Sequence, residues 1–129
     1  MIVAESQAER LRTRFGDGTR EAYADAPAEK GGAGSGFRPH ELLEAALATC
    51  VAMTVRKYAD ANDLPVEGIR VRVEVDRATV GETVFRHEIE LDGAGLTEEQ
   101  RTRLQRVAEA CPVRKTLSQK IGFSSGVRP

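Results

Sequence analysis

Residues 39–63 of the chain read PHELLEAALATCVAMTVRKYADAND and predict one long helix. Pro39 suits the first position of a helix, because a proline there lacks an N–H group that would have no partner in any case. Leu64-Pro65 is expected to end the helix, since the residue before a proline avoids helical backbone angles. The predicted helix is apolar over most of its circumference, through Leu42, Leu43, Ala46, Leu47, Cys50, Met53 and Val55. A helix of this kind is usually central and buried, so the fold should be built around it.

Strands are predicted on both sides of this helix in the sequence. Residues 69–76 and 85–91 alternate apolar with charged side chains, which is typical of strands with one buried face. Residues 11–15 and 19–24 flank the turn sequence Gly-Asp-Gly and predict a hairpin. The segment before the helix, residues 27–37 (PAEKGGAGSGF), fits neither a Walker A motif nor a dinucleotide fingerprint. We interpret it as a flexible connector.

A second helix is predicted in the last third of the chain. Thr97 and Gln100 fit a capping box, which indicates a helix over residues 98–110. A proline just after it breaks the helix, and we expect a shorter helix over residues 113–120 and a last strand over residues 121–124. The order of strands, helix, strands, helix and strand predicts an α+β fold with the helices packed on an antiparallel sheet.

Length and composition limit the architecture. At 129 residues the chain has room for one domain, residues 1–129. Tryptophan is absent and aromatic residues make up 5% of the sequence, so the core must be built mainly from Leu, Val, Ile and Ala. Such a core is thin for one small subunit. Burial against a second copy would extend it, and we therefore expect a homodimer.

The charge pattern excludes several classes of partner. The 19 basic and 20 acidic residues are interleaved and leave a net charge of −1. Without a field of one sign, the chain is not expected to bind nucleic acid or an anionic membrane. No targeting segment opens the sequence and no apolar stretch reaches bilayer length, which favours the cytoplasm. Two cysteines are too few for a secreted disulfide scaffold, and a cytoplasmic pair is more often catalytic, redox-active or buried.

Of the two cysteines, Cys111 has the more informative setting. It is expected at the N-cap of the short helix, where unpaired N–H groups, the helix dipole and the charges of Arg114 and Lys115 would stabilise a thiolate. The alternative is an inert cysteine at a helix junction. Cys50 lies in mid-helix among Leu and Ala, where a cysteine is more often a small core residue. To react, Cys50 would need a cation from another part of the chain.

The histidines and an acidic residue are further candidates. On a helical projection His40 points about 80° away from the direction of Cys50, whereas Glu41 points about 180° away. His40 is thus better placed to face a pocket at Cys50, and a solvated first-turn histidine is the alternative. The helix dipole alone can explain Glu41. His87 is expected to be buried and hydrogen-bonded on its strand. Because the cysteines and histidines lack zinc-site spacing, no metal site is predicted.

Two segments together resemble a known family. PHELLEAALATC, from Pro39 to Cys50, resembles the central-helix motif of the OsmC/Ohr family, the osmotically inducible and organic hydroperoxide resistance proteins. AEACPVRKTL, from Ala108 to Leu117, resembles the second cysteine motif of that family. The spacing of the two segments, the preceding GGAGSGFRP and the strands between them are similar as well. The resemblance covers most of the chain from Gly31 onwards.

The resemblance implies an assembly and a chemistry. It implies an intertwined homodimer in which antiparallel sheets wrap around long central helices, with the thiol sites near the dimer interface. In the peroxidase branches, the cysteine that matches Cys50 attacks the peroxide and becomes a sulfenic acid, and the one that matches Cys111 condenses with it to a disulfide. An external dithiol or lipoyl-type reductant, and no bound cofactor, restores the pair. The chain would then be an antioxidant oxidoreductase of the stress response.

The activating residues depart from the family pattern. An arginine from the N-terminal region and a glutamate on the central helix normally activate the first thiolate. Here His40 occupies the place of that glutamate, while Glu41 matches the P-x-E-L-L pattern of a less characterised OsmC-like branch. Among the arginines predicted on one strand face we choose Arg12, with Arg10 and Arg14 as alternatives.

Two functions stay open at this point. The matching cysteines favour a thiol-dependent peroxidase that reduces organic hydroperoxides, with hydrogen peroxide as a further substrate. The missing glutamate favours a non-catalytic relative that binds a small apolar ligand at the dimer interface.

Overall fold

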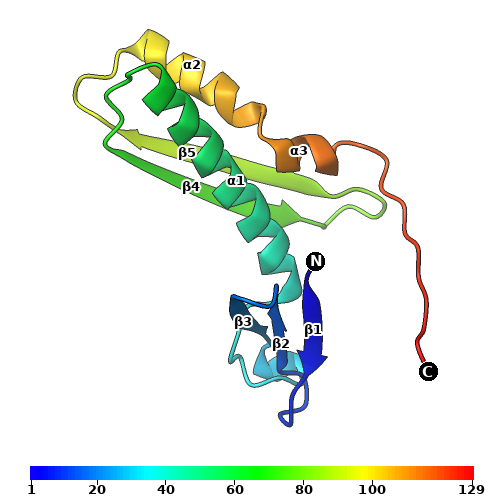
Figure 1. Cartoon of the computed structure of the whole chain (residues 1–129). Coiled ribbons are helices and arrows are strands. Elements are labelled where there is room, and N and C mark those ends of the chain that lie inside the picture. Colours follow the sequence, from blue (N-terminus) through cyan, green and yellow to red (C-terminus); the bar gives the residue numbers. More distant parts are fainter. The chain divides into compact units, whose positions relative to one another are not determined.

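The computed structural model describes every residue from Met1 to Pro129. The chain divides into two compact units, Met1–Ala45 and Ala46–Pro129. Three strands and a short 3-10 helix are followed by a helix, two strands and two more helices (Figure 1). The α+β class predicted from the sequence is confirmed. The single domain over residues 1–129 and the homodimer stay predictions.

The N-terminal unit contains a three-stranded antiparallel sheet of β1 (Val3–Ser6), β2 (Thr13–Gly16) and β3 (Glu21–Ala24). β2 is the central strand and pairs with both of the others. The predicted hairpin corresponds to β2 and β3. Asp17 closes the turn between them, because its carboxylate accepts hydrogen bonds from the backbone N–H groups of Thr19 and Arg20. The strand β1 was not predicted, and all four of its residues are exposed.

A buried carboxylate holds the Gly-rich segment that follows β3 and includes η1 (Ala28–Lys30). Asp25 is 5% exposed. It accepts hydrogen bonds from the Ser35 hydroxyl at 2.7 Å and from the backbone N–H groups of Ser35, Ala26 and Ala33 at 3.1, 2.7 and 3.2 Å. The prediction of a flexible connector is therefore wrong. The segment wraps around an anion as a phosphate-binding loop does, but the anion belongs to the chain itself.

The long helix α1 (Pro39–Ala61) begins at the predicted proline. Its buried side chains form one stripe at helical spacing: Leu47, Val51, Val55 and Ala59. In the C-terminal unit this stripe packs against Leu104 and Ala108 of α2 (Glu98–Glu109). Other apolar residues of α1 are exposed, and Met53 is 70% exposed. The expectation of a helix buried nearly all round is thus not met within one chain.

The strands β4 (Gly68–Asp76) and β5 (Val84–Asp92) form an antiparallel hairpin. Their register places Val73 opposite His87, and the apolar residues two positions away share that face. The helices α1 and α2 lie on one side of this hairpin (Figure 1), and its apolar residues pack against their buried stripe. Arginine–carboxylate pairs join the two strands on exposed side chains. The predicted alternation of buried and solvated positions is confirmed.

The C-terminal helices are α2 and α3 (Pro112–Leu117). The capping box of Thr97 and Gln100 is present as predicted. The strand predicted over residues 121–124 is wrong, because this segment pairs with neither β4 nor β5 and a strand needs a partner for its backbone groups. None of the helices is both long enough and apolar enough to cross a membrane.

Candidate active site

Two thiols come together in the C-terminal unit. Cys50 lies in the middle of α1, and Cys111 is the N-cap residue of α3. Cys50 packs against the buried cluster that contains Cys111 and is near enough to raise the pKa of Cys111, and neither sulfur is in a disulfide. Cys111 has no exposed surface, whereas Cys50 is only partly buried. Cys50 is therefore the thiol that a dissolved reagent reaches first.

A change of helix direction places Cys111 against α1. Leu104 and Ala108 bury α2 in the core, and Cys111 belongs to the same buried cluster. Pro112 cannot continue α2, because it lacks the N–H group that the helix would need, but it suits the first position of α3. The chain thus leaves α2 at a fully buried residue, and that residue is the second thiol.

Burial sets the protonation state of Cys111. Burial has the largest effect on the pKa of this thiol and raises it, because a buried site disfavours the charged form. The backbone N–H of Arg114 donates to the Cys111 sulfur at 3.3 Å and lowers the pKa, while the neighbouring Cys50 thiol raises it. The prediction that the N-cap position stabilises the Cys111 thiolate is therefore wrong, because the pKa of Cys111 is raised and not lowered. The capping hydrogen bond is present, but burial outweighs it.

Cys50 lines an apolar groove of about 730 Å³. One wall is α1, with Met53 and Tyr58, and the other is formed by the end of α2 and the start of α3, with Val107 and Val113. Most of the lining is apolar, and its single charged residue is Lys57. A molecule with an apolar body and a small reactive group can therefore approach the exposed side of the Cys50 sulfur.

Arg114 links α3 to β5. Its guanidinium Nη1 lies 3.3 Å from Nε2 of His87. A guanidinium only donates hydrogen bonds, so Nε2 must accept and the proton of the neutral ring must be on Nδ1. Nδ1 is buried and has no hydrogen-bond partner. The sequence predicted a buried, hydrogen-bonded His87, and it contained no signal that Arg114 would be the partner.

Arg10, Arg12 and Arg14 were predicted on one face of a strand, but only Arg14 lies in a strand. β2 begins at Thr13, so Arg14 lies in the strand and Arg10 and Arg12 precede it. Arg14 is held by two carboxylates of the sheet. The guanidinium of Arg12 lies 4.1 Å from the centre of the Tyr23 ring and makes no ion pair. Its charge is therefore not neutralised by a carboxylate.

The two predicted activators on α1 lie in its first turn. His40 is exposed there. Glu41 accepts hydrogen bonds from the backbone N–H and the Nε of Arg38, both at 2.9 Å, and these bonds lower the pKa of Glu41. Arg12, His40 and Glu41 all belong to the N-terminal unit, and both cysteines belong to the C-terminal one. Activation of Cys50 by any of the three stays a prediction.

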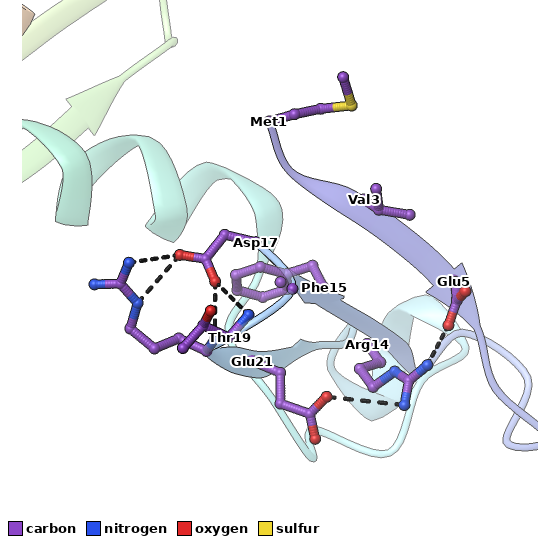
Figure 2. A pocket seen from close by; sticks show the side chains of 11 residues that line it. Met1, Val3, Glu5, Arg14, Phe15, Asp17, Thr19 and Glu21 are labelled. Carbon is purple, nitrogen blue, oxygen red and sulfur yellow. Dashed lines mark hydrogen bonds and ion pairs between the residues drawn. The ribbon is translucent and has the colours of Figure 1, made fainter.

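A separate hollow of about 410 Å³ lies on the N-terminal sheet. Figure 2 shows Arg14 between Glu5 and Glu21. Met1 and Phe15 belong to the apolar part of the hollow. The positive charge of Arg14 is therefore compensated on both sides. The lining has no cysteine and no histidine, so it offers no thiol or imidazole chemistry. The candidate active site is accordingly the thiol pair.

The model of the family described as OsmC-like protein matches residues 32–125, which include both cysteines. No curated protein sequence matches the chain.

Solved structures share the fold. The OsmC-like protein of Mycoplasma pneumoniae is 21% identical with a TM-score of 0.74, and the match covers 91% of this chain and 85% of that one. An organic hydroperoxide resistance protein of Legionella pneumophila is 22% identical with a TM-score of 0.67, over 92% and 88% of the two chains. One of Bacillus subtilis is 20% identical with a TM-score of 0.62, over 92% and 89%. At this level of identity the likeness concerns the fold.

Proposed function

The chain belongs to the OsmC-like protein family, and on this premise we propose that it is a thiol-dependent peroxidase that reduces organic hydroperoxides through Cys50 and Cys111. Hydrogen peroxide would be a further substrate. Two of the structurally similar proteins are described as organic hydroperoxide resistance proteins, which supports this substrate class. An external dithiol or lipoyl-type reductant would complete the cycle.

The proposed chemistry has two steps in one chain. The Cys50 thiolate attacks the terminal peroxide oxygen, so that an S–O bond forms, the O–O bond breaks and the alkoxide leaves as the alcohol after taking up a proton. The Cys111 thiol then attacks the Cys50 sulfur, so that an S–S bond forms and the hydroxyl group leaves as water. The reductant donates two electrons and two protons and returns both thiols.

The observation that carries the proposal is that a partly buried thiol lies beside a fully buried one. A sulfenic acid on Cys50 would form beside the thiol that has to remove it. The groove next to Cys50 supports the choice of organic peroxides, because its lining is mostly apolar.

The test is peroxide consumption by purified, reduced protein in the presence of a small dithiol. Turnover of an alkyl hydroperoxide is expected, and Cys50→Ser should abolish it. Cys111→Ser should keep the first oxidation, because Cys50 is intact, but should lose sustained turnover. Wild-type protein that consumes no more peroxide than Cys50→Ser would contradict the proposal.

A second candidate function is favoured by the groove. A non-catalytic OsmC-like protein could hold a small apolar ligand beside Cys50, where Met53 and Val107 already provide apolar walls. Binding of an apolar fluorophore that is equal in wild-type protein and Cys50→Ser, together with no peroxide turnover, would favour this binder over the peroxidase.

We also propose that the protein is a cytoplasmic homodimer. The exposed apolar surface of α1, with Met53 as its most exposed large side chain, supports the dimer, because a second copy would remove this surface from water. The thiols would then lie close to the subunit interface.

A further inference from the structure

His87 is a titratable residue that the proposed cycle does not use. It lies on β5 opposite Val73 of β4. Its Nε2 is 3.3 Å from Nη1 of Arg114, and its Nδ1 is buried without a partner. The backbone N–H of Arg114 donates to the Cys111 sulfur, also at 3.3 Å. A single residue, Arg114, therefore connects the imidazole to the buried thiol.

We propose that His87 is a positioning residue for Cys111: its neutral imidazole holds Arg114, and with it the first turn of α3, so that the Arg114 N–H stays on the Cys111 sulfur. The inference rests on the proposed function, in which Cys111 attacks oxidised Cys50. The helix α3 has only six residues. A helix this short is marginal by itself, so its orientation depends on tertiary contacts such as the one to His87.

The N–H of Arg114 acts when the sulfur gains charge. Cys111 has to become negative as it attacks, and a buried thiolate is stabilised only by donors that are already in place. The N–H of Arg114 is such a donor. If Arg114 moves, the attack on Cys50 should slow, while the earlier reaction of Cys50 with an oxidant should not change.

The contact requires His87 to be neutral. Protonation of Nε2 would place one donor against another and bring two positive charges to 3.3 Å. A protonated His87 would therefore lose the contact with Arg114.

Besides Arg114, the charged residues that line the hollow around His87 are Arg86 and Glu88. Both belong to β5, and the hollow has a volume of about 640 Å³. Arg86 forms an ion pair with Asp76 of β4. The helix α1 contributes Leu47, and β4 places Val73 opposite the ring. Glu88 carries the one negative charge in this lining, and it is exposed to solvent.

The test uses dipyridyl disulfide and no peroxide. Cys50, the accessible thiol, attacks the reagent, forms a mixed disulfide and releases one pyridinethione. Cys111 then attacks the Cys50 sulfur, forms the Cys50–Cys111 bond and releases a second pyridinethione. Two absorbance phases thus report the two thiols separately.

His87→Leu removes the acceptor and should slow the second phase about tenfold, the loss expected from one hydrogen bond to a charged group. The first phase should not change. His87→Gln keeps an acceptor oxygen that does not titrate, so it should match the wild type at about pH 8. Lys120→Gln removes an exposed charge beyond the end of α3 and should leave both phases unchanged.

Several outcomes would overturn the positioning role. One is a second phase of His87→Leu at the wild-type rate, and another is a second phase of His87→Gln that is as slow as that of His87→Leu. Equal slowing of both phases in His87→Leu would indicate a general structural role and would also overturn it. A wild type that completes both phases but turns over no peroxide contradicts the peroxidase alone.

Discussion

The Cys50 thiol on α1 lies beside the Cys111 thiol at the N-cap of α3. The two partners differ in exposure, because Cys111 has no exposed surface and Cys50 is only partly buried. In the proposed cycle this difference orders the reactions: the oxidant reaches Cys50, and Cys111 reacts only with the product formed there. A buried second thiol is also protected from oxidation by the peroxide itself.

Mild oxidation should produce a Cys50–Cys111 disulfide within one chain, because the two thiols are neighbours in the same site. Peptide mapping without reduction should identify the linked peptides in the monomer band of a denaturing gel. In Cys111→Ser, oxidation of Cys50 should stop at the sulfenic acid or continue to the sulfinic acid. Disulfides found only between chains would contradict this geometry.

The stability of the reduced protein should fall at alkaline pH. Burial raises the pKa of Cys111 in the folded state above that of an unfolded thiol, about 8.5. The raised pKa therefore contributes stability that is fully present below about pH 8.5 and is lost as the pH rises through the folded pKa. Denaturant unfolding between about pH 7.5 and 10 should show a steeper decline for wild type than for Cys111→Ala. Parallel curves would mean that Cys111 titrates as it does in the unfolded chain.

Asp25→Asn should destabilise the N-terminal unit and lower its melting temperature by several degrees. The Ser35 hydroxyl, followed by backbone N–H groups, lowers the pKa of Asp25 to about 2. The contribution is therefore present above the unfolded pKa of about 3.9 and is lost as the pH falls through the folded value. Glu29→Gln is the matched control, since it removes an exposed carboxylate from the same segment. Hydrogen exchange of residues 26–36 should increase in Asp25→Asn only, and equal exchange in both variants would argue against this role.

Met53→Glu should dissociate the proposed homodimer. Met53 is 70% exposed on the apolar side of α1, and a charge buried at an interface without a partner is costly. Sedimentation equilibrium at micromolar concentration should show a dimer for wild type and a monomer for the variant. Val80→Glu changes a fully exposed residue between β4 and β5 and should stay dimeric. Wild-type protein that is a stable monomer would refute the proposed assembly.

Arg12→Ala should slow the oxidation of Cys50 by about tenfold or more if an arginine stabilises its thiolate, since one unit of pKa corresponds to a tenfold change in thiolate. Because arginine stays charged, the activation should not vary between about pH 6 and 8. His40→Gln should have little effect. The control is Arg20→Ala, because Arg20 is exposed and paired with Asp17. Unchanged rates in Arg12→Ala with a collapse in His40→Gln would show that the histidine is the activating partner.

Local signals predicted much of the fold. Pro39 and the Thr97–Gln100 capping box marked helix starts, and the alternation of residues 69–76 and 85–91 marked the hairpin. These features depend on neighbours within a few residues, so the sequence contains them directly. The motifs around Cys50 and Cys111 likewise sufficed to place the chain in its family.

The properties of the site could not be predicted from local sequence signals. The sequence placed Cys111 correctly at an N-cap, but the direction of its pKa depends on how completely α1 and α2 exclude water from it. The hydrogen bond between Arg114 and His87 joins segments that are distant along the chain. The sequence by itself thus determined which residues cap, turn and alternate, because those effects are short-ranged. Tertiary structure decided the direction of the Cys111 pKa and the neighbours of both thiols, because burial and hydrogen bonding depend on residues that only folding brings together.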